Sequence, residues 1–258
     1  MDRSSIQTMS HRATYCRQRV EALVERVFPG MGLRPAWLTL VSAICLSFYL
    51  VYGRWSSMPD WFFRFSSEWT GIALPSFHRA GWSHLSALVI LMIVPFSIGK
   101  LIEGWRPADF GLSLKGAHKE FLICICLWLA LLPILWFVSE TFEFQRAYPR
   151  LDAVKTSGFI FVTYHLYYLI KWIAWEFFFR GFMLFGFKKD LGSRAVLIST
   201  LPFVVVHMNK PTLEMLGSVA GGFILCWIAL RSRSIWPGVF LHWLVYVSLE
   251  FFGSIWWR

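Results

Sequence analysis

The stretch Lys171–Phe187, KWIAWEFFFRGFMLFGF, is an almost wholly apolar segment whose interior holds two opposite charges, Glu176 and Arg180. In an α-helix, residues four positions apart lie on the same face, so these two side chains can pair. A charged group at the centre of a bilayer costs roughly 2.5 to 3.5 kcal/mol on insertion scales. We therefore expect Glu176 to have a partner and to mark a functional site.

The composition of the chain predicts an all-α, polytopic integral membrane protein. Of its 258 residues, 57% are apolar and only 16% are charged, and the mean hydropathy is +0.54. Runs of about 18 or more apolar residues suffice to cross a hydrocarbon core of roughly 30 Å. We predict seven spanning helices, or eight if residues 53–81 contain another: 36–52, 82–101, 120–137, one within 159–187, 194–208, 212–230 and 235–252.

The net charge of +10 does not indicate a nucleic-acid partner. No basic run alternates with aromatic residues in a soluble segment, and the positive charges lie between hydrophobic spans, so the expected surroundings are a lipid bilayer. Lys and Arg are about twice as frequent in one set of connecting segments as in the other. In membrane proteins the cytoplasmic loops carry the excess of Lys and Arg. The richer set of segments includes residues 1–35, so we predict that the N-terminus lies in the cytoplasm.

Residues 1–35 form a separate basic segment. Its apolar side chains fall at helical spacing and give one stripe opposite charged residues, formed by Val20, Leu23, Val24, Val27 and Phe28. This pattern predicts an amphipathic helix at the membrane interface. Packing of the same helix on the protein's own cytoplasmic face is the alternative. Residues 36–258 are expected to be embedded in the membrane.

Three ionisable residues lie inside predicted spans of the C-terminal half: Glu176, His207 and His242. At 1.5 Å per residue, the first two lie about 18 Å and the third about 14 Å from the inner boundary. A single buried histidine is more often a hydrogen-bonded core residue than a catalytic one. Their common depth nevertheless predicts that the three side chains meet in one site.

A carboxylate with two imidazoles suits two chemistries. Glu176 can act as a general base on a water molecule that His207 and His242 hold, while the histidines also stabilise an oxyanion. Alternatively, the same three side chains can bind zinc and leave a position open. Both arrangements hydrolyse an amide. We expect a site without a cofactor, because no fourth ligand can be named.

Several ordered motifs resemble the CPBP family, the CAAX proteases and bacteriocin-processing enzymes that are related to the type II CAAX prenyl endopeptidase. They are WEFFFRGF, F-x-x-x-H at Phe203–His207, K-P-x-x-E at Lys210–Glu214, and SIWPGVFLHW ending at Trp243. The resemblance covers residues 172–246 well. It implies a membrane-embedded protease domain over 36–258 with its site in 171–246, in the cell (cytoplasmic) membrane of a bacterium.

The resemblance also implies roles for individual residues. In the family's first motif, Glu-Glu-x-x-x-Arg, the first Glu activates the water. Aligning on Arg180 puts Trp175 at that position and Glu176 at the second. The second and third motifs imply His207 and His242. The family's Asn four residues after the last histidine is replaced by Tyr246, which keeps a hydrogen-bonding group there.

The sequence thus predicts an intramembrane endopeptidase that hydrolyses a membrane-associated or lipidated peptide or protein. Arg180 holds Glu176 in this interpretation. The alternative is a catalytically inactive membrane protein that binds or shields a peptide or partner, since Trp175 departs from the family pattern. Two further acidic residues are expected to be structural: Glu214, paired with Lys210 at i+4, and Glu250, solvated near a helix end.

Overall fold

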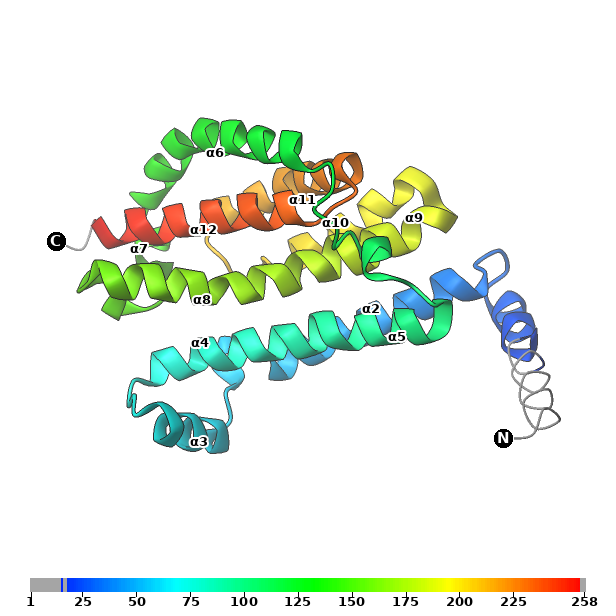
Figure 1. The fold of residues 1–258 in the computed structure, drawn as a ribbon, viewed down its shortest axis with the longest axis horizontal. Coiled ribbons are helices and arrows are strands. Elements are labelled where there is room, and N and C mark those ends of the chain that lie inside the picture. Colours follow the sequence, from blue (N-terminus) through cyan, green and yellow to red (C-terminus); the bar gives the residue numbers. More distant parts are fainter. Residues whose placement is uncertain (1–14, 16–17, 256–258) are drawn as a thin grey trace. The chain divides into compact units, whose positions relative to one another are not determined.

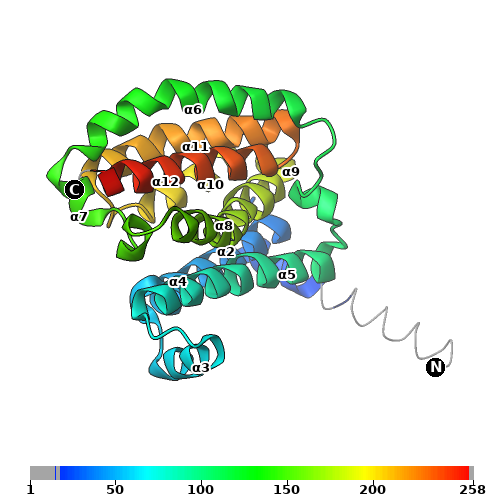
Figure 2. The same ribbon diagram turned by 60° about the vertical axis from the view of Figure 1, so that its left-hand side comes forward.

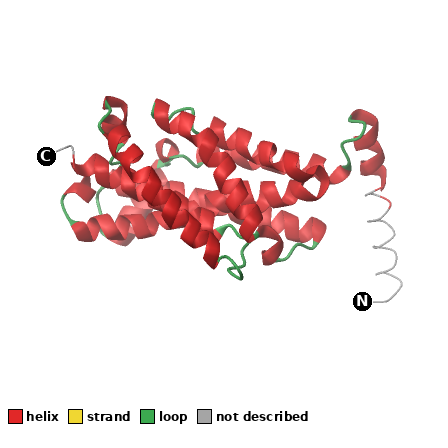
Figure 3. Ribbon diagram, turned by 90° about the horizontal axis from the view of Figure 1, so that it is seen from above, coloured by secondary structure: helices red, strands yellow, loops and turns green. Residues whose placement is uncertain are grey.

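The computed structural model describes residue 15 and residues 18–255, and within them every regular element is helical. Figure 3 shows helices joined by short loops and no strand among the described residues. The predicted all-α fold is therefore confirmed. The chain divides into two compact units, Met1–Ile44 and Cys45–Arg258.

The smaller unit contains a helix over residues 18–27, where the apolar stripe predicted one. The place of this helix at a membrane surface stays a prediction. The helix α2 (Leu33–Tyr52) contains the boundary between the two units.

The larger unit continues with the helices of Figure 1. A first group precedes the site-bearing helices: α3 (Asp60–Thr70), α4 (Pro75–Ser86), α5 (Val94–Glu103), α6 (His118–Ser139) and α7 (Phe142–Ala147). The second group carries the predicted site: α8 (Gly158–Glu176), α9 (Phe185–Leu191), α10 (Ala195–Val205), α11 (Thr212–Ser232) and α12 (Trp236–Ile255). Short π-helical segments, Ala87–Ile93 and Phe177–Leu184, join α4 to α5 and α8 to α9.

Five helical stretches of the described residues are long and apolar enough to cross a membrane: 33–52, 75–103, 118–139, 212–232 and 236–255. They coincide with five of the predicted spans. The predicted span at 194–208 is shorter than expected, because α10 has only 11 residues, or about 16 Å at 1.5 Å per residue. The chain leaves the helix after Val205 and turns before Pro211, which cannot donate a backbone hydrogen bond.

The loop at 53–81 contains no additional span. The longest helix that lies wholly inside this loop is α3. It has 11 residues and mixes charged with aromatic side chains.

Helix α12 is the element around which the C-terminal half packs. It contacts α6, α8 and α11, while α10 contacts α11 and the π-helical segment Phe177–Leu184. Figure 2 shows α6 bowed over α11 and α12, and Pro133 lies inside this helix, where a missing N–H favours bending. The segments that carry Glu176, His207 and His242 thus surround a common interior.

Glycines mark the closest approaches around this interior. A Cβ at Gly181 would lie 2.8 Å from the backbone oxygen of Phe110, and one at Gly222 would lie 2.7 Å from Thr200 Cγ2. At Gly217 and Gly221 a Cβ would meet nothing within 4 Å in the described chain. Close packing therefore uses Gly181 and Gly222.

We expect Gly181→Ala to lower the thermal unfolding midpoint of the detergent-solubilised protein, because the backbone at Phe110 cannot move aside as a flexible side chain could. Overpacking of this kind costs about 1 to 3 kcal/mol. Gly217→Ala is the matched control, with open space at its Cβ and a gain in helix propensity. Equal midpoints for the two variants would contradict the packing argument.

Candidate active site

Glu176 and Arg180 form a fully buried ion pair. Arg180 Nη1 lies 3.1 Å from Glu176 Oε1, and both side chains have no exposed surface. Arg180 Nη2 lies 3.5 Å from the carbonyl oxygen of Gly222, and the guanidinium lies 4.2 Å from the centre of the Phe203 ring. The i, i+4 pairing predicted for the two residues is present, although Arg180 lies in the π-helical segment. Such segments occur frequently at functional sites.

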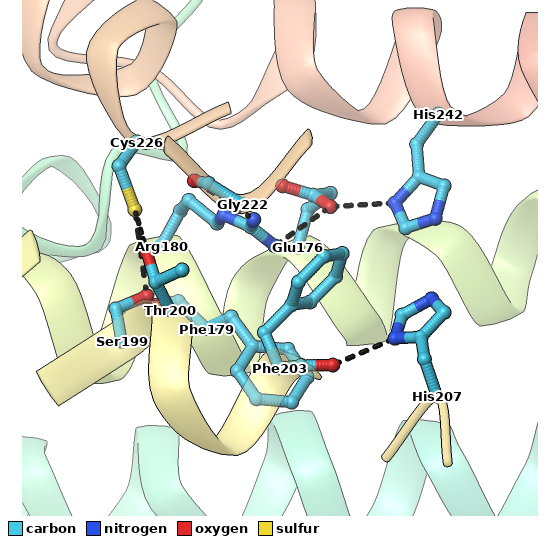
Figure 4. Close-up of polar contacts among 10 residues, drawn as sticks. All are labelled: Glu176, Phe179, Arg180, Ser199, Thr200, Phe203, His207, Gly222, Cys226 and His242. Carbon is cyan, nitrogen blue, oxygen red and sulfur yellow. Dashed lines mark hydrogen bonds and ion pairs between the residues drawn. The ribbon is translucent and has the colours of Figure 1, made fainter. Parts of the chain in front are cut away.

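His242 of α12 joins this pair. Its Nδ1 lies 2.8 Å from Glu176 Oε1, as Figure 4 shows. The other carboxylate oxygen, Oε2, is buried with no hydrogen-bond partner among the described residues. It lies beside Gly238, where a Cβ would be only 3.1 Å away. The glycine of the SIWPG motif therefore leaves room for the carboxylate.

His207 lies just beyond α10 and is held differently. Its Nδ1 lies 2.6 Å from the backbone oxygen of Phe203. The Phe203 ring contacts both histidines, with centroid distances of 4.7 Å to His207 and 5.8 Å to His242. The F-x-x-x-H spacing explains the first contact, because the carbonyl of residue i faces residue i+4 on a helix.

These hydrogen bonds determine which ring nitrogen carries the proton. A carbonyl oxygen only accepts, so His207 Nδ1–H is the donor to Phe203. An ionised carboxylate also only accepts, so His242 Nδ1–H is the donor to Glu176. In each neutral imidazole Nε2 then keeps its lone pair. Neither Nε2 has a hydrogen-bond partner among the described residues, so each can take a proton.

A cavity of about 440 Å³ lies beside these groups, a volume typical of ligand sites. His207, Trp172, Trp175 and Tyr246 are among its lining residues, whereas Glu176 and His242 are not. Trp172 covers His242, with 4.0 Å between the ring centroids. The structure thus places Glu176 behind the cavity wall and the aromatic side chain of Trp175 on it.

Tyr246 lies one helical turn from His242 and is buried. Its ring stacks on Tyr168 with a centroid distance of 4.4 Å and contacts Trp172 at 5.3 Å. The aromatic side chains around the histidines gave no separate signal in the sequence, because aromatic residues make up 19% of the chain.

The two acidic residues expected to be structural differ in outcome. Lys210 Nζ lies 2.7 Å from Glu214 Oε1, so the predicted ion pair is confirmed. Burial lowers the pKa of Lys210 to about 8, which leaves it mostly protonated at pH 7. The prediction that Glu250 is solvated was wrong: its side chain has no exposed surface. The backbone nitrogen of Arg150 lies 3.2 Å from Glu250 Oε1 and 3.1 Å from Glu250 Oε2, because the loop at residues 148–150 covers α12 there.

The zinc alternative concerns the side chains of Glu176, His207 and His242. No group of three His, Cys, Asp or Glu side chains in the described part of the chain is arranged to hold a metal ion. Of the two Glu176 carboxylate oxygens, Oε1 accepts hydrogen bonds from Arg180 and His242, and Oε2 has no partner among the described residues. The dependence of activity on a metal stays a prediction, to be tested by chelation.

Residues 160–248 match the family model described as type II CAAX prenyl endopeptidase Rce1-like. This match confirms the resemblance that the motifs carried, over nearly the same residues. No curated protein and no solved structure matches the chain.

We expect Arg180→Met to destabilise the protein by about 3 to 5 kcal/mol, because it leaves the Glu176 carboxylate buried without its cation. Arg231→Met is the matched control. Arg231 Nε also pairs with a carboxylate, Glu120 Oε1 at 3.0 Å, but its side chain is 53% exposed. Its partner Glu120 is only 7% exposed, but water solvates the Arg231 charge, so we expect this pair to contribute less than the fully buried one. Chemical unfolding in detergent measures the free energy of unfolding of both variants. If Arg180→Met lowers it no more than the control does, the role of the buried pair is contradicted.

Proposed function

Because residues 160–248 are similar to the Rce1-like family of type II CAAX prenyl endopeptidases, we propose that this membrane protein is an intramembrane endopeptidase. Its substrate is a peptide or lipidated protein held at the bilayer. The observation that carries the proposal is the hydrogen-bonded chain from Arg180 through Glu176 to His242, with His207 beside it and on the cavity wall.

The proposed chemistry assigns proton transfer to an imidazole. His207 Nε2 takes a proton from a water molecule in the cavity as that water attacks the scissile carbonyl carbon. The proton then passes to the leaving amine. His242, whose side chain is 12% exposed, takes up a proton from solvent at Nε2 and donates it as a hydrogen bond to the carbonyl oxygen on which negative charge develops. Glu176 stabilises the positive charge of this imidazolium.

Glu176 has a different role here from the one the sequence suggested. We expected it to activate water directly, yet it is fully buried and does not line the cavity. A carboxylate hydrogen-bonded to Nδ1 of a histidine fixes the tautomer and orientation of the ring. We therefore propose that Glu176 acts through His242, and that Arg180 keeps the carboxylate ionised.

A second candidate function is a catalytically inactive membrane protein that binds a peptide. One observation favours it: Trp175 lies on the cavity wall, packed against Tyr49 and Phe179 at centroid distances of 5.5 and 5.4 Å. This is the position of the carboxylate that activates water in the family motif.

We expect His207→Ala and His242→Ala to lower the rate of peptide cleavage by about 10² to 10⁴, the contribution of a positioned acid or base. The assay uses protein in lipid nanodiscs and a farnesylated fluorogenic peptide with a C-terminal Cys-aliphatic-aliphatic-X sequence. Glu176→Gln should also lower the rate, and a chelator should leave wild-type cleavage unchanged.

Lys188→Met serves as the control for this series, since Lys188 is exposed in α9 and lies away from the cavity. Stably folded wild-type protein that cleaves nothing would contradict the peptidase proposal and favour the binding function. Loss of cleavage on chelation would instead indicate a metal enzyme.

We expect Trp175→Glu to raise the cleavage rate about tenfold or more, because it places a carboxylate on the cavity wall where a general base can reach water. The Trp175→Gln variant has a side chain of nearly the same shape as Glu but without its charge. It therefore separates the effect of the carboxylate from the effect of removing the indole. Rates that rise equally in both variants would show that the indole blocks the cavity and that no carboxylate is needed there.

A further inference from the structure

The short helix α3 exposes a row of large aromatic side chains. Trp61, Phe65 and Trp69 are 63%, 63% and 81% exposed. They follow one another at i, i+4 and i+8, so their side chains line one edge of the helix. We call this row the aromatic edge.

The charged residues of α3 form a separate edge. Asp60, Arg64 and Glu68 repeat at the same helical spacing, one position before the aromatic residues. All three are exposed. Two acidic side chains and one basic side chain leave this edge with an excess of one negative charge, so α3 does not attract anionic partners.

A third face of α3 packs on the first turns of α4. The Phe62 ring lies 5.1 Å from the Trp82 ring, and the Phe63 ring lies 5.3 Å from the His78 ring. Ser66 Oγ lies 2.8 Å from His78 Nδ1. These contacts fix the rotation of α3 about its axis and turn the aromatic edge away from α4.

Hydrogen bonds hold this arrangement at the ends of two long apolar helices. His78 Nε2–H donates to the carbonyl oxygen of Ile72, at 2.6 Å. Trp82 Nε1–H donates to the carbonyl oxygen of Tyr52 at the end of α2, at 2.8 Å. Figures 1 and 2 both show α3 beside the start of α4, on the opposite side of α4 from α8.

The sequence of the helical stretch 75–103 places α3 near the boundary of the hydrocarbon core. This stretch has 29 residues, about 43 Å at 1.5 Å per residue, which exceeds a core of roughly 30 Å. Residues 75–84 include two histidines, an arginine and two serines, whereas residues 85–99 contain no ionisable side chain. The core therefore begins near Leu85, and Trp82 lies about 4.5 Å outside it.

The same stretch shows on which side α3 lies. His78 and Trp82, which contact α3, share a helix face with Leu85 and Val89, because these positions are three or four residues apart. Leu85 is 48% exposed and Val89 is 40% exposed, so this face turns toward lipid within the core. Helix α3 thus lies at the end of a lipid-facing surface.

The chemistry of the aromatic edge suits this level of a bilayer. An indole has a large apolar body and one N–H, so it can contact acyl chains and a polar headgroup at once. Trp is enriched at membrane–water interfaces for this reason. A helix with separate apolar and charged sides lies in the interface, with its apolar side about 5 to 10 Å into the boundary between headgroups and acyl chains.

We propose that the aromatic edge of α3 inserts among phospholipids at the bilayer boundary, so that α3 anchors the connection between α2 and α4 at a fixed depth. The partner is a zwitterionic phospholipid, because the charged edge offers no attraction to an anionic one. This contact lies outside residues 160–248, which match the family, and it is independent of the proposed peptidase chemistry.

The test uses p-benzoylphenylalanine, a photoreactive aromatic amino acid, in place of Phe65 or Trp69 in the full-length protein. Both side chains are exposed, so an aromatic replacement leaves the packing of α3 on α4 intact. The protein is irradiated in vesicles of phosphatidylcholine, and mass spectrometry of its peptides measures the yield of lipid adducts. We expect both positions to give several times the yield of position 68.

Two controls define the scale of this experiment. Position 68 replaces Glu68 on the charged edge of the same helix. Position 129 replaces Leu129, which is 53% exposed on the spanning stretch 118–139, and should form lipid adducts. Equal yields at positions 65 and 68, with adducts at position 129, would overturn the proposal. Crosslinks from position 65 to a second copy of the chain would also overturn it and assign the aromatic edge to a dimer.

A second set of vesicles, which mixes phosphatidylglycerol with phosphatidylcholine, tests the role of charge. We expect the same yield at positions 65 and 69 in both vesicles. Adducts that form only with the anionic lipid would indicate a contact driven by charge and would overturn the insertion of the aromatic edge.

Discussion

The ion pair between Glu176 and Arg180 is the constraint on which the C-terminal half of the structure depends. Both side chains are fully buried among apolar residues, and neither charge could remain there alone, because an unpaired buried charge costs several kcal/mol. The surrounding elements satisfy the pair at close range. Gly222 supplies a carbonyl oxygen, Phe203 its ring, and His242 an N–H. Helices α10, α11 and α12 thus each contribute one group that contacts these two charges.

This arrangement also explains why small residues lie next to the site. Gly238 leaves space for Glu176 Oε2, and Gly181 lets the π-helical segment approach the backbone at Phe110. A side chain at Gly238 would push against the Glu176 carboxylate, and one at Gly181 would push the π-helical segment away from Phe110. Buried polar networks stabilise a fold only when their hydrogen bonds are made with good geometry, so the site and the packing around it depend on the same few contacts.

The cavity and the buried pair together suggest how polar chemistry can take place inside a membrane helix bundle. The charged pair lies behind the wall and orients His242, while His207 lies on the wall. In the proposed peptidase, water and peptide would then meet an imidazole without reaching the carboxylate. Trp175 and Trp172 contribute apolar surface around the histidines, which lowers the local dielectric constant and strengthens each electrostatic contact.

The sequence by itself determined the fold class, five helices that are long and apolar enough to span a membrane, and the pairing of Glu176 with Arg180. Hydropathy and the i, i+4 spacing act locally along the chain. The match at residues 160–248 confirms the family resemblance of its motifs. Only the tertiary structure decided the burial of Glu250, the partner of His242 and the common lining of the cavity by Arg54, Arg150 and Lys210. These depend on contacts between residues far apart in the chain. The common depth of Glu176 and His242 predicted that they meet, but only the structure gives the atoms that bind.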